Sequence, residues 1–439
     1  MQFTKTLIAA AGNAGGEPSW LAFYRPQLTT SGENFNEWTS ISVNSGGQIA
    51  LGNVSDNYGS LQVAVIEPDG TLLQSKKYEY YIFGKHQTAF DSSDKLVVTG
   101  QGFQEIQSIR LNPDFNSTDK YFSYTIAYQE SGYGFGQSYS QGAGCNQIIP
   151  LDVNTVLFHY TLNFDWNFGT TPKDVVGIID FGSEVIYKVG AGDSGGSGIC
   201  TTITPFATLA WANLGYDDNF YNYYYQGAYT DRYDLNNSAS IQSMMRSPTQ
   251  TNVIYYGQNS NWQKINTDSG SVFGGKSYTI NGVAADFTQV MIHDDDGNIY
   301  RCGNITISSI RYIYILKFDL ADNVLGAKLI RGQNGSNLFG RVDAKCHNGF
   351  LHLTVMYGTT YRHNAFVLKT DTFDIDGTYT GLADTFIIST GTVSTTANST
   401  STFSYLGQQN LVDSNSAQPE DGSGAINNTT VLYTNFNEL

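Results

Sequence analysis

The residues that most suggest metal chemistry form the run His293-Asp294-Asp295-Asp296-Gly297-Asn298. An EF-hand calcium loop needs oxygen ligands at alternate positions and a bidentate glutamate at its twelfth position. Counted from Asp294, the twelfth position is Ile305, which carries no oxygen ligand in its side chain. Clusters of Asp, Asn and Gly are typical of tight turns in which the aspartate accepts hydrogen bonds from its own backbone. We therefore expect a turn here, and we expect no metal and no cofactor.

A second candidate for chemistry is Gly192-Asp193-Ser194-Gly195-Gly196, which matches the sequence around the nucleophile of trypsin-like serine proteases. That chemistry needs a histidine as base and an aspartate that orients it. The TAAHC-type segment around such a histidine is absent, and Ser197 stands where a proline usually follows. We interpret the run as a Gly-Ser turn between two structural units.

The remaining histidines and carboxylates do not indicate a catalytic site. The six histidines are scattered, with no HxH or HExxH pair, and His159 and His352 lie inside apolar runs that predict core positions. Most of the 39 acidic residues lie in predicted turns. A glycosidase needs two carboxylates that face each other across the substrate, and no pair can be chosen from the sequence. We therefore predict that the protein is not an enzyme, and a polysaccharide-cleaving enzyme stays open as an alternative.

The cysteines do not indicate a metal site either. Cys145, Cys200, Cys302 and Cys346 include no CxxC pair, which excludes a zinc ribbon. Three of them occupy predicted strands, where a small buried side chain fits. We expect four free, buried thiols.

Charge and hydropathy exclude two classes of partner. The net charge is −16 and the pI is about 4.6, so phosphate backbones would be repelled and nucleic-acid binding is not expected. No apolar run approaches the ~20 residues of a membrane helix. The apolar run Leu7–Ala11 is shorter than the roughly 7–15 residues of a secretory signal, so we expect an N-terminal arm rather than a signal peptide.

Three segments rich in aromatic and polar residues are the predicted binding sites: 128–139, 163–168 and 216–233. Tyr and Trp offer rigid apolar faces with a polar edge, which suits sugar or protein surfaces. The ligand-binding candidates are Tyr133, Phe135, Trp166, Tyr223, Tyr224 and Tyr225. The alternative is that these aromatic side chains pack between structural units.

The elements that must position these residues are strands. The stretch 287–332 contains four β-prone runs separated by turn-forming clusters of Asp, Asn and Gly. Related copies follow the same order of strands and turns, at 38–80, 86–127, 145–189, 199–237, 240–280 and 339–390. In the poorest copy, 199–237, the middle strands are expected at 207–215 and 228–235. Four strands per copy and a period of about 45–55 residues predict an all-β propeller with seven four-stranded blades and little helix.

The chain ends are predicted to serve the ring. Trp20–Arg25 resembles a lone closing strand that precedes the first complete copy, and rings often close by pairing strands from both chain ends. The tail is rich in Ser, Thr and Asn, which favours an extended arm that adds strands. We predict a short N-terminal arm at 1–17, a propeller at 18–390 and an extended C-terminal arm at 391–439.

The repeats resemble those of the β-propeller repeat proteins of tailed bacteriophages, especially marine ones. In those repeats a polar turn precedes an apolar strand that ends in Gly, followed by a Lys-bearing strand and a second turn. The matching segments are 293–323 and 364–377, with Lys317 and Lys369 in the third strands, and the turns Ser45-Gly46-Gly47 and Pro68-Asp69-Gly70. The resemblance covers nearly the whole chain, and the copies between 128 and 237 depart from it most.

The resemblance implies a non-enzymatic structural protein of the virion, located on a tail fibre or another exposed appendage. Its expected partners are other virion proteins and a glycan or protein of the host cell surface. A structural component of the capsid surface and a secreted lectin-like propeller remain alternatives. We further expect the three aromatic segments to emerge side by side on one face, provided that they leave their blades at the same end.

Overall fold

The computed structural model describes most of the chain. The described residues are 19–26, 35–55, 61–78, 83–101, 106–124, 144–166, 169–183, 185–193, 201–203, 209–213, 219–224, 229–234, 243–250, 252–266, 269, 271–333, 338–359, 362–381, 384–398, 404–410, 413–415, 418–419, 426–428 and 431–438. These residues form strands and turns, and they include no helix. Among them there is consequently no helix that could cross a membrane.

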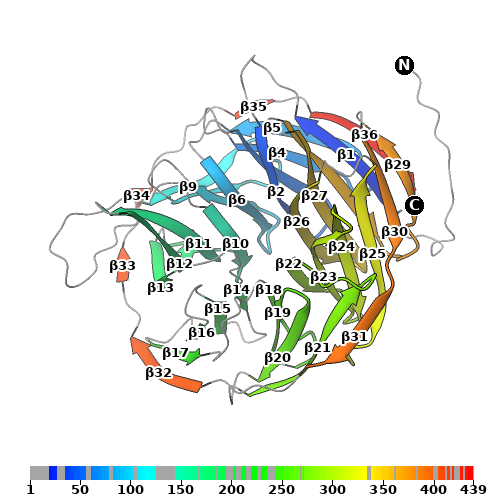
Figure 1. The fold of residues 1–439 in the computed structure, drawn as a ribbon. Helices are drawn as coiled ribbons and strands as arrows, with labels where there is room; N and C mark the ends of the chain where they lie inside the picture. Colours follow the sequence, from blue (N-terminus) through cyan, green and yellow to red (C-terminus); the bar gives the residue numbers. More distant parts are fainter. Residues whose placement is uncertain are drawn as a thin grey trace.

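The strands form a ring of seven antiparallel blades around a central axis (Figure 1), which confirms the predicted propeller. The innermost strands are β2, β6, β10, β14, β18, β22 and β26, and each contacts the innermost strand of the next blade. Blades 7 and 1 are also joined by one parallel backbone pair, Phe35 with Arg362.

The first three blades are built as follows. Blade 1 contains β2 (Phe35–Val43), β3 (Ile49–Ser55), β4 (Leu61–Ile66) and β5 (Leu72–Tyr78). Blade 2 contains β6 (Phe83–Phe90), β7 (Leu96–Gln101), β8 (Ile106–Leu111) and β9 (Thr118–Tyr124). Blade 3 contains β10 (Gly144–Pro150), β11 (Thr155–Trp166), β12 (Gly169–Asp180) and β13 (Val185–Asp193).

The other four blades follow the same order. Blade 4 contains β14 (Thr201–Ile203), β15 (Leu209–Asn213), β16 (Asn219–Tyr224) and β17 (Tyr229–Asp234). Blade 5 contains β18 (Ser243–Arg246), β19 (Val253–Gln258), β20 (Asn261–Asn266) and β21 (Val272–Ile280). Blade 6 contains β22 (Phe287–His293), β23 (Ile299–Ile307), β24 (Ile310–Phe318) and β25 (Val324–Gly332). Blade 7 contains β26 (Leu338–His347), β27 (Phe350–Thr359), β28 (Arg362–Thr370) and β1 (Trp20–Pro26).

In blade 4 the sequence predicts the second strand correctly and the third strand wrongly. The third strand is Asn219–Tyr224, and the run expected there forms the fourth strand, Tyr229–Asp234. The sequence pattern places the aromatic residues of 219–224 in a loop instead. A run of Tyr, Phe and Asn has both strand-forming and turn-forming members, so local sequence does not separate the two states.

Aspartate side chains fix the turns, as the sequence predicts. Asp294 Oδ1 accepts a hydrogen bond from the backbone N–H of Asn298 at 2.7 Å, and Asp319 Oδ1 accepts one from Asn323 at 2.8 Å. Gly70 and Gly297 each have a φ of 84°, a left-handed conformation that glycine adopts without strain. In each of these turns the chain reverses over five residues, and hydrogen bonds from the backbone and from the aspartate side chain hold it in place.

The antiparallel order of the strands gives the ring two different faces. The turns between first and second strands and between third and fourth strands lie at one end of the blades, which we call the turn face. The connections between second and third strands, and those that lead to the next blade, lie at the opposite end, which we call the crossover face. The first residue of β1 and the last described residue of the chain meet at the turn-face end of blade 7, where Trp20 pairs with Glu438.

The ring closes in blade 7, where the N-terminal strand β1 is the fourth strand. It pairs on one side with β28 and on the other with β36 (Val431–Glu438) near the C-terminus. Strands from both chain ends therefore meet in one blade, which confirms the predicted closing strand.

The C-terminal strands follow the outer rim of the ring in the direction opposite to the order of the blades (Figure 1). After β29 (Gly377–Gly381), which pairs with β30, the chain adds one outer strand to each blade in turn. These are β30 (Asp384–Thr390) on blade 6, β31 (Val393–Ala397) on blade 5, β32 (Ser404–Asn410) on blade 4, β33 (Asp413–Asn415) on blade 3, β34 (Gln418–Pro419) on blade 2, β35 (Ile426–Asn428) on blade 1 and β36 on blade 7. We call this series, 384–438, the belt. The predicted boundary between propeller and arm lies at residue 390. The first outer strand, β30, ends at that residue, and the boundary stays a prediction.

The belt covers some fourth strands completely and others only in part. In blades 4 and 7 every residue of the fourth strand pairs with the belt, and the register between third and fourth strands is regular. In blades 1, 2, 3, 5 and 6 the belt covers part of the fourth strand, and each of these has a β-bulge or irregularity between its third and fourth strands. Free strand edges promote aggregation, and bulges are one way to block further pairing. The outer rim is thus protected by the belt, by a bulge, or by both.

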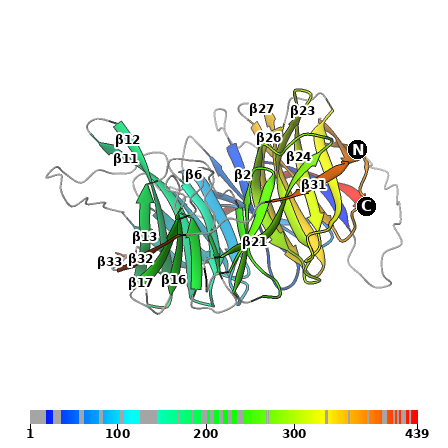
Figure 2. The same ribbon diagram turned by 60° about the horizontal axis from the view of Figure 1, so that its bottom comes forward.

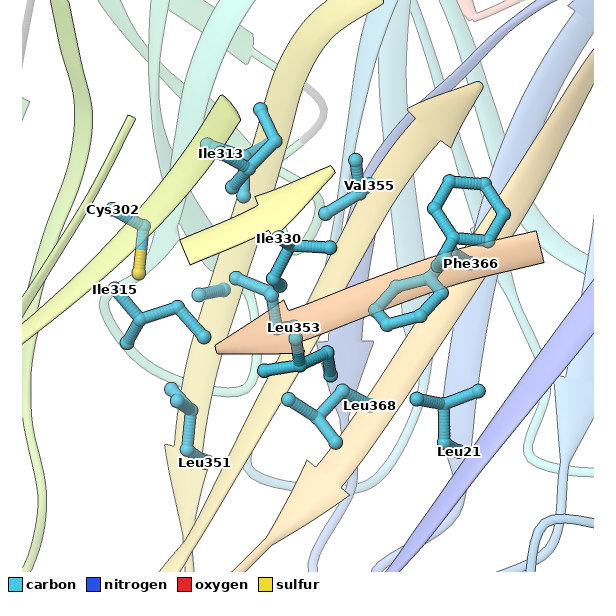
Figure 3. Packing of buried hydrophobic residues seen from close by; sticks show 14 of the residues in the cluster. Leu21, Cys302, Ile313, Ile315, Ile330, Leu351, Leu353, Val355, Phe366 and Leu368 are labelled. Atoms are coloured by element: carbon cyan, nitrogen blue, oxygen red, sulfur yellow. The ribbon is translucent and has the colours of Figure 1, made fainter. Parts of the chain in front are cut away.

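Apolar side chains between blades form the core. Figure 3 shows the cluster between blades 6 and 7, where Ile315 and Ile330 of blade 6 face Leu353 and Leu368 of blade 7, with Leu21 of β1 beside them. All five side chains are buried. Alternate residues of both facing sheets enter such a layer, which explains why third strands are apolar over several consecutive positions.

Candidate functional site

The hairpin of β11 and β12 in blade 3 extends beyond the other two strands of its blade at the crossover face. Each strand has 12 residues, more than any other described strand. The pairing of β10 with β11 ends at Thr161, and the pairing of β13 with β12 ends at Lys173. Beyond these residues, 163–166 and 169–172 pair only with each other among the described strands. We call these two segments the blade 3 extension, and Figure 2 shows it above the neighbouring strands.

The extension is a two-stranded ribbon at the end of its blade. Four residue pairs at about 3.3 Å each give a two-stranded ribbon roughly 13 Å long. A ribbon of two strands has no core of its own, so isolated hairpins are marginally stable. Its sequence, NFDW followed after two residues by GTTP, places aromatic residues at two alternate positions of β11, Phe164 and Trp166. Aromatic residues at such a position are suited to an interaction surface.

The structure describes 163–166 of one predicted binding segment, whereas the segment 128–139 lies outside the described residues. Trp166 is the last residue of β11, at the tip of the extension. Tyr133 and Phe135 lie outside the described residues, in the connection that ends at Gly144. Gly144 is the first residue of β10 and pairs with Thr161, at the base of the extension.

The third predicted segment lies elsewhere. Tyr223 and Tyr224 belong to β16, the third strand of blade 4, and Tyr225 lies outside the described residues. Because third strands run from the crossover face to the turn face, Tyr224 ends its strand at the turn face, whereas Trp166 ends its strand at the crossover face. Trp166 and Tyr224 therefore lie at opposite faces, and the position of the segment 128–139 stays a prediction. Strand direction decides this point, and the misassigned strand in blade 4 hides that direction from the sequence.

A second site, which the sequence does not suggest, lies buried between blades 5 and 6. Arg301 on β23 is fully buried, and its Nη2 donates hydrogen bonds to the carbonyl oxygen of Asn259 at 3.1 Å and to Thr288 Oγ1 at 2.8 Å. Thr288 Oγ1 lies 2.6 Å from the hydroxyl of Tyr314, which in turn accepts a hydrogen bond from the Tyr278 hydroxyl at 2.9 Å. Burial raises the pKa of Tyr314 well above its ordinary value, so this hydroxyl stays neutral.

Aromatic rings and a glycine enclose the guanidinium group of Arg301. Its Cζ lies 5.0 Å from the ring centroid of Tyr278 and 5.9 Å from that of Trp262. A Cβ at position 257 would lie 2.6 Å from Arg301 Nη2, so only glycine fits there. The sequence carries a partial signal, because a single arginine stands inside the apolar run of β23 and a glycine near the end of β19. Neither shows that the two residues meet.

The other candidate residues named from the sequence are structural in the described part of the chain. Asp294 belongs to a turn, as predicted, and the described residues contain no group of three His, Cys, Asp or Glu arranged to hold a metal ion. Cys145 and Cys302 are free and buried, and Cys346 is free but only half-buried, which corrects that part of the prediction. Cys200 and Ser194 lie outside the described residues. His352 is buried, and burial together with the charges of Lys369 and His347 lowers its pKa to about 3.

Comparisons with known proteins assign no function to this chain. No family model and no curated protein matches the chain. Among solved structures it is similar to the β-propeller domain of Cps50 (Swd1) from Myceliophteria thermophila, with a TM-score of 0.40 and 10% identity over 76% of this chain and 99% of that one. The Dos1 propeller gives 0.41 and 8% over 78% and 94%, and polysaccharide lyase Uly1 gives 0.41 and 6% over 81% and 98%. These neighbours have varied functions, and at such identity none of their functions transfers to this chain.

Proposed function

We propose that this protein is a non-enzymatic component of a bacteriophage virion, placed on a tail fibre or another exposed appendage. In that role it binds other virion proteins or a glycan or protein on the host surface. The support from sequence is the resemblance of the repeats 293–323 and 364–377 to phage propeller repeats.

The structural observation that carries the proposal is the belt. Residues 384–438 add an outer strand to all seven blades, and the last of these strands pairs with β1. The closing strand β1 pairs with β28 on one side and with β36 on the other, so strands from both ends of the described chain take part in the closure. A protein exposed on a particle outside the cell needs slow unfolding and protected strand edges, and the belt provides both.

The blade 3 extension is the proposed contact with the host. It lies at the crossover face, whereas Trp20 and Glu438 pair at the turn face of blade 7. Attachment of the turn face to the particle would leave the extension pointing away from it.

The first test is location. Antibodies against the purified ring, observed by electron microscopy of intact particles, should label an appendage. Labelling of the capsid alone would support the capsid-surface alternative, and absence of the protein from purified particles would contradict the proposal.

The second test is competition for adsorption. Purified protein should reduce attachment of particles to host cells, and a variant with residues 163–172 replaced by Asn-Gly should not. That replacement closes the hairpin between Leu162 and Lys173, which pair in the structure, with a two-residue turn. The matched control is Leu325→Ser on the outer rim, which should compete like the unchanged protein. Release of fragments from host polysaccharide by the purified protein would contradict the non-enzymatic assignment.

A further inference from the structure

Two exposed turns of the described chain consist of an asparagine followed by a glycine. Asn348-Gly349 joins β26 to β27 in blade 7, and Asn281-Gly282 follows β21 in blade 5. The φ angles are 49° at Asn348, 51° at Asn281 and 79° at each glycine, as in two-residue turns that need positive φ at both positions. A Cβ added at either glycine would meet no other atom within 4 Å, so both turns have free space there.

An asparagine that precedes a glycine can lose its side-chain amide without an enzyme. The backbone nitrogen of the glycine attacks the side-chain carbonyl carbon, ammonia leaves, and a cyclic imide forms. Water then opens the imide at one of its two carbonyl groups, which gives either aspartate or isoaspartate. Glycine favours the attack because it has no Cβ to obstruct it. The rate depends on whether the carboxamide is free to turn toward the nitrogen, and on the group that accepts the proton of that nitrogen.

The carboxamide of Asn281 is held by the C-terminal part of the chain. Its Oδ1 accepts a hydrogen bond from the backbone N–H of Thr392 at 2.8 Å, and the Asn281 backbone N–H donates to the carbonyl oxygen of Thr392 at 2.7 Å. Thr392 lies between β30 and β31, so these two bonds fix the start of the outer strand of blade 5. The carboxamide has to leave Thr392 before it can turn toward Gly282, which slows the reaction.

The surroundings of Asn348 differ in both respects. Its carboxamide makes no hydrogen bond within the described part of the chain. The attacking nitrogen already contacts a base, because the Gly349 N–H donates to Asp295 Oδ2 at 3.2 Å. Asp295 belongs to the turn between β22 and β23 of blade 6, so the carboxylate comes from the neighbouring blade. This distance lies within the reach of a general base.

We propose that Asn348 is a site of spontaneous conversion to isoaspartate, with the Gly349 nitrogen as nucleophile and Asp295 Oδ2 as the acceptor of its proton. A bond forms between Gly349 N and Asn348 Cγ, the bond from Cγ to Nδ2 breaks, and the proton on Asp295 passes to the departing ammonia. Water is the only other reactant. Isoaspartate adds a negative charge and a main-chain atom to the turn, which weakens the contact of Gly349 with Asp295. The site is independent of the proposed virion role.

The direct test is peptide mapping of the full chain after incubation at mildly alkaline pH, with mass spectrometric fragmentation that separates isoaspartate from aspartate. Asn348 should convert at least about fivefold faster than Asn281, because the carboxamide of Asn281 first has to break an ordinary hydrogen bond. Equal rates at the two residues, or the absence of isoaspartate at position 348, would overturn the proposal.

The control for local sequence is the same incubation in concentrated urea, which unfolds both turns. The two rates should then converge, because each asparagine still precedes a glycine and the folded surroundings are lost. A ratio of rates that persists in urea would assign the difference to local sequence and would also overturn the proposal.

The role of the carboxylate is tested with Asp295→Asn. Conversion at Asn348 should slow severalfold, while conversion at Asn281 in the same molecules stays unchanged. The matched control is Asp296→Asn, the next exposed residue of the same turn, which should leave both rates unchanged. An unchanged rate at Asn348 in the Asp295 variant would overturn the assignment of Asp295. The comparison of the unchanged protein with and without urea decides on the site itself, even if a variant does not fold.

Discussion

Blade 5 and blade 7 each contact the next blade through one tryptophan and one lysine. The two residues lie on the third and fourth strands in both blades, but in opposite order. In blade 5, Trp262 lies on the third strand and pairs in register with Lys276 on the fourth. The Trp262 Nε1 donates to Asp322 Oδ1 at 3.4 Å, and the Lys276 ammonium group donates to the carbonyl oxygen of Asp322. Lys264 adds an ion pair of 2.8 Å to Asp322 Oδ2. All three side chains thus reach the turn between the third and fourth strands of blade 6.

In blade 7 the lysine lies on the third strand and the tryptophan on the fourth. Trp20 pairs in register with Lys369, and both donate to the carbonyl oxygen of Pro68, at 2.7 Å and 2.9 Å. Tyr24 adds a hydrogen bond of 2.9 Å to the carbonyl oxygen of Gly70. These acceptors belong to the corresponding turn of blade 1.

In both junctions the two side chains contact the turn between the third and fourth strands of the next blade, although they come from exchanged strands. A tryptophan N–H and a lysine ammonium group hold the same turn of the next blade in both junctions. The acceptors differ in part, because blade 6 offers both the carboxylate and the carbonyl oxygen of Asp322, whereas blade 1 offers backbone carbonyl oxygens. In blade 7 the tryptophan comes from the N-terminal strand, so there the contact also closes the ring.

The largest expected effect is the loss of either tryptophan. Trp262 is fully buried and stacked on Phe318 with ring centroids 4.5 Å apart, and Trp20 is 1% exposed. Trp262→Ala and Trp20→Ala should each reduce the free energy of unfolding by about 3–5 kcal/mol. Denaturant titration followed by circular dichroism measures this, with the Phe variants as controls that keep the ring and lose the N–H. A loss below about 1 kcal/mol in either Ala variant would mean that the two junctions are not equivalent.

The second largest loss of stability is expected when the carboxylate of Asp322 is removed, in the junction of blades 5 and 6. Asp322→Asn leaves Lys264 without its anionic partner and should cost about 1–3 kcal/mol, less at high salt. The matched control is Asp69→Asn in the corresponding turn of blade 1, where Asp69 is exposed and accepts hydrogen bonds from Thr71. That variant should change stability by less than about 0.5 kcal/mol. Equal losses in both variants would remove the difference between the junctions.

The blade 7 junction should respond to pH through His352, which pairs in register with Lys369. Its pKa is lowered to about 3 in the folded protein, by burial first and then by the charges of Lys369 and His347. The unfolded chain, with a pKa near 6.5, binds the proton more readily, so this contribution is complete above pH ~6.5 and is lost as the pH falls toward 3.

The expected slope from this group is about 1.4 kcal/mol per pH unit in that window. His352→Leu should therefore show a weaker loss of stability between pH 6.5 and 5.5 than the unchanged protein, as measured by urea titration. Parallel pH profiles of the two proteins would show that His352 is not buried in its neutral form.

The smallest effect is expected at the second residues of the fourth strands of blades 1 and 6. Leu73 and Leu325 each lie at a register shift in the fourth strand, and they are 48% and 52% exposed. Leu73→Lys and Leu325→Lys should each change the free energy of unfolding by less than about 0.5 kcal/mol. Thermal unfolding with light scattering should show unchanged midpoints and no more aggregation. A loss above 1 kcal/mol at one of them would show that the two bulges pack differently.

The sequence by itself determined the local part of this structure. Alternation of apolar residues predicts strands, and Asp-Gly and Asp-Asn clusters predict turns, because both signals depend on neighbours within a few residues. The repeat of these signals predicts seven blades, and an aromatic run such as Trp20–Arg25 ahead of the first copy predicts the closing strand. The repeat also places Lys369 in a third strand, without any indication of what it contacts.

The tertiary structure alone decided which residues meet across blades. Lys369 and Pro68 are 301 residues apart, and no local pattern links a lysine to a carbonyl oxygen at that distance. The belt is a sequence of short polar strands whose path depends on the edges that the ring leaves open, so its reverse course around the rim follows from the assembled blades. The surroundings of the Arg301 side chain also depend on the tertiary structure, because Arg301 belongs to blade 6 and its neighbours Gly257 and Tyr278 belong to blade 5. Contacts of this kind depend on the geometry of the closed ring, which exists only once all seven blades have packed.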